Sequence, residues 1–119
     1  MKGRPFVQRL GFAAAGIRTV GLRERSVRTQ GKLALAAAAL AAWAQPGLIW
    51  AALIALAIAL VLALEAMNAA LEYLIDHLHP ELAEEIGHAK DAAAGAVLIG
   101  SLGALAVGAL AAASVLVAA

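Results

Sequence analysis

The chain has 119 residues, of which 64% are hydrophobic and only 14% are charged. A charged fraction well below the roughly 25% of soluble domains excludes an ordinary soluble enzyme and indicates a small polytopic membrane protein of one domain. The absence of cysteine excludes a disulfide framework and a thiolate metal site, and we expect no nucleic-acid partner.

The net charge of +1 hides a strong segregation of charge along the chain. Eight of the nine basic residues precede Leu33, and seven of the eight acidic residues lie between Glu65 and Asp91. In residues 1–30, apolar residues recur at helical spacing between arginines, which predicts an amphipathic helix on an anionic membrane surface. The alternatives are a disordered basic leader and a signal peptide that ends near Ala44.

Three apolar runs follow, and they predict three membrane-spanning helices. The first run ends in a tight break at residues 45–47, the second keeps a helical period until just before Pro80, and the third is uncharged. The predicted fold class is an all-α membrane protein, a helical bundle of one amphipathic surface helix and three transmembrane helices. The expected limits are 1–30 for the surface helix, 31–46 for the first span, 48–78 for the second span with a cytoplasmic extension, 79–90 for a cytoplasmic connection and 91–118 for the third span.

The basic leader also predicts the orientation, because positively charged segments tend to stay in the cytoplasm. The helical hairpin then returns residues 65–91 to the cytoplasmic side, and the third span leaves the C-terminus outside. We therefore expect the basic leader and the acidic segment to meet at the same face of the membrane.

A line of polar residues marks the end of the second apolar run. At about 100° per residue, Glu65, Asn68, Glu72 and Asp76 fall within one narrow arc of a helix. Carboxylates are costly at the edge of a membrane, so this line predicts a functional site that could hold a divalent cation and deprotonate a hydroxyl. Two other interpretations stay open, namely snorkelling of Glu65 to water and a solvated face of an extended helix.

A second polar group stands before the third span. Lys90 and Asp91 lie at the N-terminus of this helix, where a lysine suits the phosphates of a nucleotide, although such a pair is also a common interfacial anchor. The sequence contains no glycine-rich phosphate loop of the usual kind. The histidines at 77, 79 and 88 are interpreted as solvated loop residues, because no two of them are four apart on a helix.

Two motifs together resemble a known family. The segments Glu65-x-x-Asn68-x-x-x-Glu72 and Gly87-His88-Ala89-Lys90-Asp91-x-x-x-Gly95 resemble the small integral-membrane prokaryotic diacylglycerol kinases, a family that includes undecaprenol kinases. Upstream, Gly11-Phe12-x-x-x-Gly16 and Glu24-x-x-x-Arg28 are similar to the amphipathic leader of that family. The resemblance runs from about Gly11 to the end of the third span.

The resemblance implies a homotrimer in a bacterial inner membrane, with the N-terminus and the active site in the cytoplasm. It implies ATP as co-substrate, Mg²⁺ as cofactor and a membrane lipid as acceptor, with Glu65 as the base that takes the proton of the lipid hydroxyl. The other implied roles are magnesium binding for Glu24 and Glu72; nucleotide binding for Phe12, Glu24, Asn68, Glu72, Glu81, Lys90 and Asp91; and lipid binding for Arg28, Glu65 and Ala94.

The chain departs from the family pattern without losing a catalytic carboxylate. Gln30 stands where diacylglycerol kinases often carry a glutamate, and Ala69, Val27 and His88 are further departures. These departures bear on lipid preference. The resemblance implies phosphorylation of diacylglycerol to phosphatidic acid, with undecaprenol kinase activity as the alternative. A small transport subunit and a non-enzymatic scaffold are the competing functions from other classes.

Overall fold

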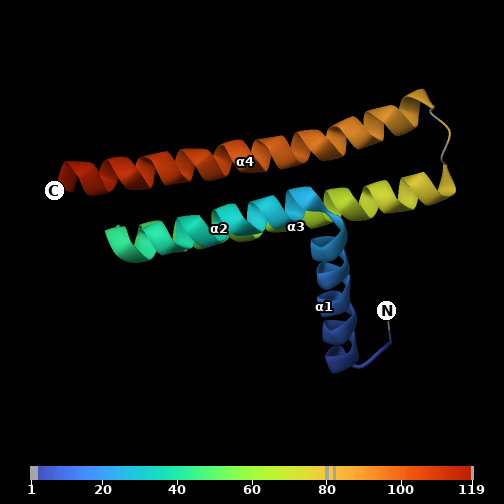
Figure 1. The fold of residues 1–119 in the computed structure, drawn as a ribbon, viewed down its shortest axis with the longest axis horizontal. Helices are drawn as coiled ribbons and strands as arrows, with labels where there is room; N and C mark the ends of the chain where they lie inside the picture. The colour runs from blue at the N-terminus through green and yellow to red at the C-terminus, as the bar shows by residue number, and fades with distance from the viewer. Residues whose placement is uncertain (1–2, 80, 82, 119) are drawn as a thin grey trace.

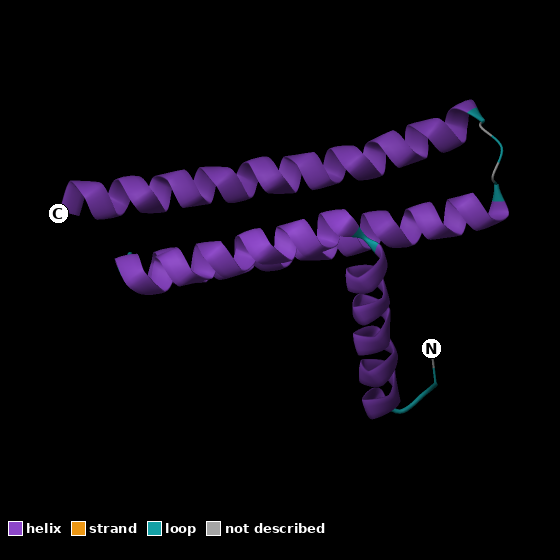
Figure 2. Ribbon diagram, in the orientation of Figure 1, coloured by secondary structure: helices purple, strands orange, loops and turns teal. Residues whose placement is uncertain are grey.

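Within the residues that the structure describes, the chain folds into four α-helices (Figures 1 and 2). The computed structural model describes residues 3–79, 81 and 83–118. Within these residues no strand is present, so the expected all-α class is confirmed. The helices are α1 (Phe6–Arg23), α2 (Arg25–Ala44), α3 (Leu48–Leu78) and α4 (Glu84–Ala118).

The connection between α1 and α2 is the single residue Glu24. Its backbone is extended (φ −105°, ψ 115°), and its N–H donates to the carbonyl of Val20, 2.8 Å away. The Arg28 guanidinium donates to the carbonyls of Gly21 (3.2 Å) and Leu22 (2.9 Å) at the end of α1. These groups have no partner inside the helix, so Arg28 caps α1 from the next helix. As a result α1 runs crosswise to the other three helices (Figure 1).

This break differs from the expected surface helix of residues 1–30. The first helix, α1, ends at Arg23, and residues 25–30 form the first turns of α2. Residues 1 and 2 lie outside the described part of the chain. Because Glu24 is neither glycine nor proline, local propensity alone did not indicate a break there.

The turn between α2 and α3 lies at residues 45–47, where the sequence predicts it. Gln45 adopts the left-handed conformation (φ 52°), and its side-chain amide donates to the carbonyl of Ala42 at 2.6 Å. Gly47 follows with φ 105°, a conformation that L-residues with a side chain rarely adopt. The hairpin therefore lays α2 beside α3 (Figure 1).

Two of the helices, α3 and α4, are long and apolar enough to cross a membrane. The helix α2 carries Arg25, Arg28 and Lys32 in its first turns, and its uncharged part from Leu33 to Ala44 falls short of the roughly 20 residues of an average span. The number of spans expected from the sequence therefore stays a prediction.

The helix α4 begins earlier than the third span was expected to begin. Residues 84–90, expected in the connection, are helical and lengthen α4 to 35 residues. The end of α3 at Leu78 agrees with the expected limit of its helical periodicity. Pro80, which was expected to interrupt the chain there, lies outside the described residues.

Close contact between α3 and α4 depends on Gly100. A Cβ placed at this buried glycine would lie 2.6 Å from Cδ1 of Leu64. Elsewhere the helices bury little within one chain: the buried apolar residues of the described chain are Val20, Val61, Ala69 and Ala111. Most large apolar side chains remain exposed, as expected for helices whose faces contact lipid or other helices within a membrane.

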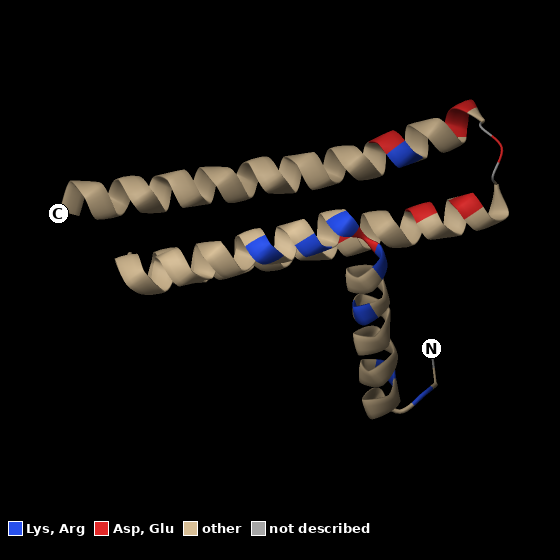
Figure 3. Ribbon diagram, in the orientation of Figure 1, with Lys and Arg blue, Asp and Glu red and all other residues tan. Residues whose placement is uncertain are grey.

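Charges occupy one part of this structure. The end of the bundle that holds the α2–α3 turn and the C-terminal part of α4 has no charged residue, whereas charges gather around α1, the start of α2 and the opposite ends of α3 and α4 (Figure 3). The basic leader and the acidic segment therefore lie on the same side, as the sequence predicts.

Candidate active site at the charged end of the bundle

Glu65 is the buried charged residue of the site. It lies on α3, and only 6% of its surface is exposed. Its Oε2 atom accepts a hydrogen bond from the Ser26 hydroxyl at 3.2 Å, and its Oε1 atom accepts one from the Gln30 amide at a long 3.5 Å. Both donors come from the first turns of α2. A buried carboxylate without such donors would be strongly destabilising, so the α2–α3 contact is what permits Glu65 to lie here.

One turn further along α3, Asn68 and Glu72 form a polar pair. The Asn68 amide donates to Oε1 of Glu72 at 3.3 Å, as residues four apart on a helix can do. The other polar atom of Asn68, its Oδ1, is buried and has no hydrogen-bond partner among the described residues. Such an unpaired acceptor is costly to bury, and a bound cation or donor would relieve that cost.

Glu24 reaches the same part of α3 from the α1–α2 corner. Its carboxylate lies close enough to Tyr73 to act electrostatically on it, and the buried Tyr73 hydroxyl oxygen has no hydrogen-bond partner by geometry among the described residues. Glu72 also acts electrostatically on Tyr73. The Arg23 guanidinium carbon lies 4.6 Å from the centre of the Tyr73 ring, within the range of a cation–π contact. Tyr73 is therefore stacked by Arg23 and lies within the electrostatic influence of Glu24 and Glu72.

Lys90 joins α4 to α3 beyond this cluster. Its Nζ atom forms an ion pair with Oδ1 of Asp76 at 2.5 Å, with the Lys90 side chain 35% exposed and that of Asp76 62% exposed. Asp91, the next residue, is exposed. Lys90 thus lies at the charged end of the bundle, and its ammonium group is already paired with the Asp76 carboxylate.

The remaining predicted site residues lie apart from Glu65 or point elsewhere. Phe12 is exposed on α1, with the Arg4 guanidinium 5.3 Å from its ring centre. Glu81 is exposed and pairs with His79 at 3.5 Å, a contact that is ionic only when the histidine is protonated. Ala94 is exposed on α4. Arg28, expected at the lipid site, directs its guanidinium to the end of α1.

No group of three or more acidic, histidine or cysteine side chains in the described residues could hold a metal ion by itself. The residues that fit a hard cation best are Glu24 and Glu72, together with the unpaired Asn68 Oδ1. All three are oxygen donors, which Mg²⁺ prefers, and Mg²⁺ is usually shared between one or two carboxylates and substrate phosphates.

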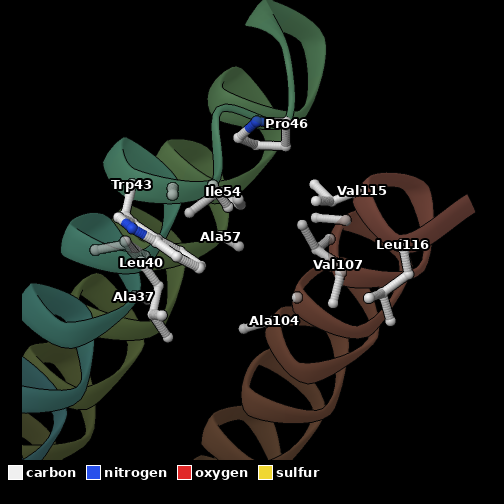
Figure 4. Close-up of a pocket in the computed structure, with 16 residues that line it drawn as sticks. Ala37, Leu40, Trp43, Pro46, Ile54, Ala57, Ala104, Val107, Val115 and Leu116 are labelled. Atoms are coloured by element: carbon white, nitrogen blue, oxygen red, sulfur yellow. The ribbon is translucent and has the colours of Figure 1, made fainter. Parts of the chain in front are cut away.

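A separate groove of about 410 Å³ opens at the uncharged end of the bundle (Figure 4). Its walls are apolar side chains of α2, α3 and α4, including Leu40, Trp43, Ile54 and Val107. The lining contains no ionisable side chain, so the groove lacks the groups that proton or phosphoryl transfer requires.

Sequence reasoning missed Ser26 and Tyr73 as members of the site, and it treated Gln30 only as a departure from a pattern. Ser26 and Gln30 are four residues apart and therefore share a helix face, which was a usable signal. The partner of that face was not visible, because Glu65 is more than 30 residues further along the chain.

The described residues thus form an all-helical protein with apolar, exposed helix faces and with carboxylates gathered at one end, which are the features of a membrane protein with a polar site. The model of the family described as prokaryotic diacylglycerol kinase matches residues 11–112. The chain is 31% identical over 93 residues to the diacylglycerol kinase of Escherichia coli (strain K12), which covers 78% of this chain and 76% of that protein. The match to the diacylglycerol kinase of Shigella flexneri has the same extent.

The chain therefore belongs to the prokaryotic diacylglycerol kinase family, and the resemblance seen in its motifs is confirmed. It is a lipid kinase and a membrane protein. The transporter and scaffold interpretations lose their support, because neither explains this match over most of the chain.

Proposed function

We propose that the protein transfers the γ-phosphate of ATP to the hydroxyl of a membrane lipid at the cytoplasmic surface, with diacylglycerol as the acceptor. In this reaction the lipid oxygen bonds to the γ-phosphorus while the bond from that phosphorus to the bridging oxygen of ADP breaks. The hydroxyl proton must leave at the same time. The observation that supports this proposal most directly is the buried, hydrogen-bonded carboxylate of Glu65 at the charged end of two membrane-length helices.

In this proposal Glu65 is the general base. Each of its oxygens accepts one hydrogen bond from α2, so each retains a lone pair for the lipid hydroxyl. A base contributes typically 10²–10⁴-fold when it is held within hydrogen-bond reach of its proton. Burial restricts the motion of Glu65, which favours such positioning.

Glu24, Glu72 and Asn68 are proposed to hold Mg²⁺ and the phosphates of ATP. When bound, Mg²⁺ neutralises the negative charge of the phosphates. The meeting of Glu24 and Glu72 at Tyr73 and the unpaired oxygen of Asn68 support this assignment. Without a cation, two nearby carboxylates repel each other, so the pair is well suited to one.

Lys90, Asp91, Phe12 and Glu81 are proposed as further nucleotide contacts, and Arg28 and Ala94 as lipid contacts. These assignments come from the family resemblance. For Lys90, the phosphates of ATP would compete with Asp76 for the ammonium group.

The assembly and topology also belong to this proposal. We propose three spans, with limits near 31–46, 48–78 and 91–118, and a homotrimer, as the resemblance implies. A cytoplasmic N-terminus agrees both with the resemblance and with the charge segregation. Many exposed apolar side chains would then be covered by lipid and by neighbouring copies.

The test is a kinase assay on protein purified in lipid nanodiscs, with Mg-ATP and either diacylglycerol or undecaprenol. We expect phosphatidic acid to form faster than undecaprenyl phosphate. Faster phosphorylation of undecaprenol would reassign the acceptor within the family, and no phosphorylation of either lipid by folded protein would refute the proposal.

Glu65→Gln tests the role of the base, because the amide keeps the size of the side chain but cannot take the proton. We expect turnover to fall by about 10²–10⁴-fold, while binding of a non-hydrolysable ATP analogue stays within about twofold of the unmodified protein. Parallel loss of nucleotide binding would show that Glu65 is not a dedicated base.

A further inference from the structure

Glu65 is held by two neutral donors that no role has yet explained. Ser26 and Gln30 donate to different oxygens of the carboxylate, and they stand one helical turn apart on the same face of α2. The pair therefore holds both oxygens of the carboxylate, whereas a single hydrogen bond would leave the carboxylate free to rotate. We infer that Ser26 and Gln30 are positioning residues that set the orientation of Glu65 and keep its hydrogen-bonded surroundings neutral; this inference rests on the proposed function.

Among the elements around Glu65, α2 is the one that supplies hydrogen-bond donors to its carboxylate. On its own helix, the next polar side chain, Asn68, is occupied with Glu72. From α4, the buried Gly100 approaches Leu64, the residue before Glu65, and α4 has no charged residue from Ala92 onward. From the corner, Glu24 faces Tyr73.

The charged residues of α2 itself make no ion pair with Glu65. Arg28 points to the end of α1, and Arg25 and Lys32 are exposed. Within the described residues, the hydrogen-bond partners of Glu65 are thus a hydroxyl and an amide. Neither group titrates, so neither changes its charge when the base takes a proton.

The position of the two donors also connects the base to the proposed cation site. Ser26 follows Glu24 by two residues, and Glu24 is the corner between α1 and α2. The corner residue before α2 is therefore a proposed metal ligand, and the first turn of α2 carries a donor to the base. A short link of this kind keeps the attacking hydroxyl and the phosphate aligned, and a misplacement of about 1 Å can cost about 10²-fold in rate.

The chemistry of Gln30 can be judged by comparison with a glutamate at the same position. A carboxylate there would lie about 3.5 Å from the Glu65 carboxylate, and two such groups cannot both remain ionised at low cost. One of them would keep a proton to a higher pH. The neutral amide of Gln30 avoids this repulsion and donates a hydrogen bond to Glu65 instead.

The experiment measures kcat, KM for ATP and the pH dependence of kcat/KM for four variants in nanodiscs. The first is Ser26→Ala combined with Gln30→Ala, which removes both donors. The second is Gln30→Glu, which adds a like charge. Ser26→Thr keeps the hydroxyl, and Thr29→Ala is the matched control, because Thr29 is exposed on the same turn of α2.

We expect the double alanine variant to lose at least about tenfold in kcat, with KM for ATP within twofold of the unmodified protein. For Gln30→Glu we expect the acidic limb of the pH profile to move upward by about one unit. Ser26→Thr and Thr29→Ala should keep both kcat and the profile.

A purely structural role would lower the yield or thermal stability of the variants but leave the pH profile of the folded enzyme in place, and that result would overturn the inference. A kcat within twofold for the double variant would also overturn it. If the double variant does not fold, Ser26→Ala and Gln30→Glu decide by the same criteria. Failure of the unmodified protein to phosphorylate either lipid would instead count against the proposed function.

Discussion

The two charged residues on which the proposed reaction most depends are held in opposite ways. Glu65 is buried and accepts two neutral hydrogen bonds, whereas Lys90 forms a partly exposed ion pair with Asp76. Exposed ion pairs contribute only about 0–1 kcal/mol to stability, because solvent screens the charges and two long side chains lose freedom. The pair is therefore weak enough for Lys90 to exchange Asp76 for a phosphate.

Substitution at each end of this pair separates the two roles of Lys90. We expect Lys90→Ala to raise KM for ATP by about tenfold or more, since hydrogen bonds to charged groups contribute about 1.5–3 kcal/mol. Asp76→Asn, the matched control, should change KM for ATP by less than about threefold, because it removes only the exposed pair. Steady-state kinetics at varied ATP concentration measures both effects. An equal increase of KM for ATP in the two variants would mean that the ion pair itself, and not the ammonium group, supports nucleotide binding.

Among the helices, the α1–α2 corner is the feature that sequence reasoning did not predict. Helical periodicity continues on both sides of Glu24, and no proline or glycine marks the position. The break is stabilised by contacts that are not local patterns: the Arg28 cap on α1 and the stacking of Arg23 on Tyr73 of α3. The turn at Gln45–Gly47 was predictable, because the Pro46-Gly47 dipeptide is a turn signal in the sequence itself.

If Arg28 caps α1, its removal should loosen the corner. We expect Arg28→Ala to increase hydrogen exchange of the last-turn amides of α1 by about three- to tenfold, because a lost hydrogen bond of this type costs about 1 kcal/mol. Exchange within α3 should not change. Arg18→Ala is the control, since Arg18 is an exposed arginine within α1 itself. An unchanged exchange rate in Arg28→Ala would exclude the cap as the source of the corner's rigidity.

The contact of α3 with α4 yields a second prediction for the helices. At Gly100 an added methyl group would meet the flexible end of Leu64, so alanine requires only a shift of that side chain. A β-branched side chain is larger and stiffer, and we expect Gly100→Val to destabilise the protein by about 1–3 kcal/mol.

Reversible unfolding in mixed micelles measures this effect. Gly103→Val is the matched control, because a Cβ at Gly103 meets no atom within 4 Å. Combining Gly100→Val with Leu64→Ala should recover part of the loss, since the two side chains compete for the same space. Equal destabilisation by valine at both glycines would show that helix propensity, and not the contact with Leu64, determines the result.

For the molecule as a whole, composition and charge order predicted more than the details of the site. The apolar runs predicted which residues would form α3 and α4. The segregation of basic and acidic residues along the chain predicted that the two kinds of charge would lie on the same side of the bundle (Figure 3). The donors of Glu65 were not predictable in the same way. They depend on which faces of α2 and α3 meet, and that is set by the hairpin geometry and by packing between helices.

The same charge order predicts how the protein lies in the membrane. Because basic segments remain in the cytoplasm, α1 and the start of α4 should be cytoplasmic, and the α2–α3 turn should be outside. The chain contains no cysteine, so single cysteines can be introduced without a background signal. Suitable positions are the exposed residues Arg18, Gln45 and Glu85.

We expect an impermeant thiol reagent added to intact spheroplasts to label the Gln45→Cys variant and to leave Arg18→Cys and Glu85→Cys unlabelled. Opening the membrane with detergent should expose all three, which controls for accessibility. The physical reason is that moving the eight basic residues before Leu33 across the bilayer would be far more costly than moving the uncharged turn. Labelling of position 18 from outside would reverse the topology, and labelling of 45 and 85 from the same side would mean that α3 does not span the membrane. Either outcome would separate Glu65 from cytoplasmic ATP and with it remove the basis for the proposed reaction.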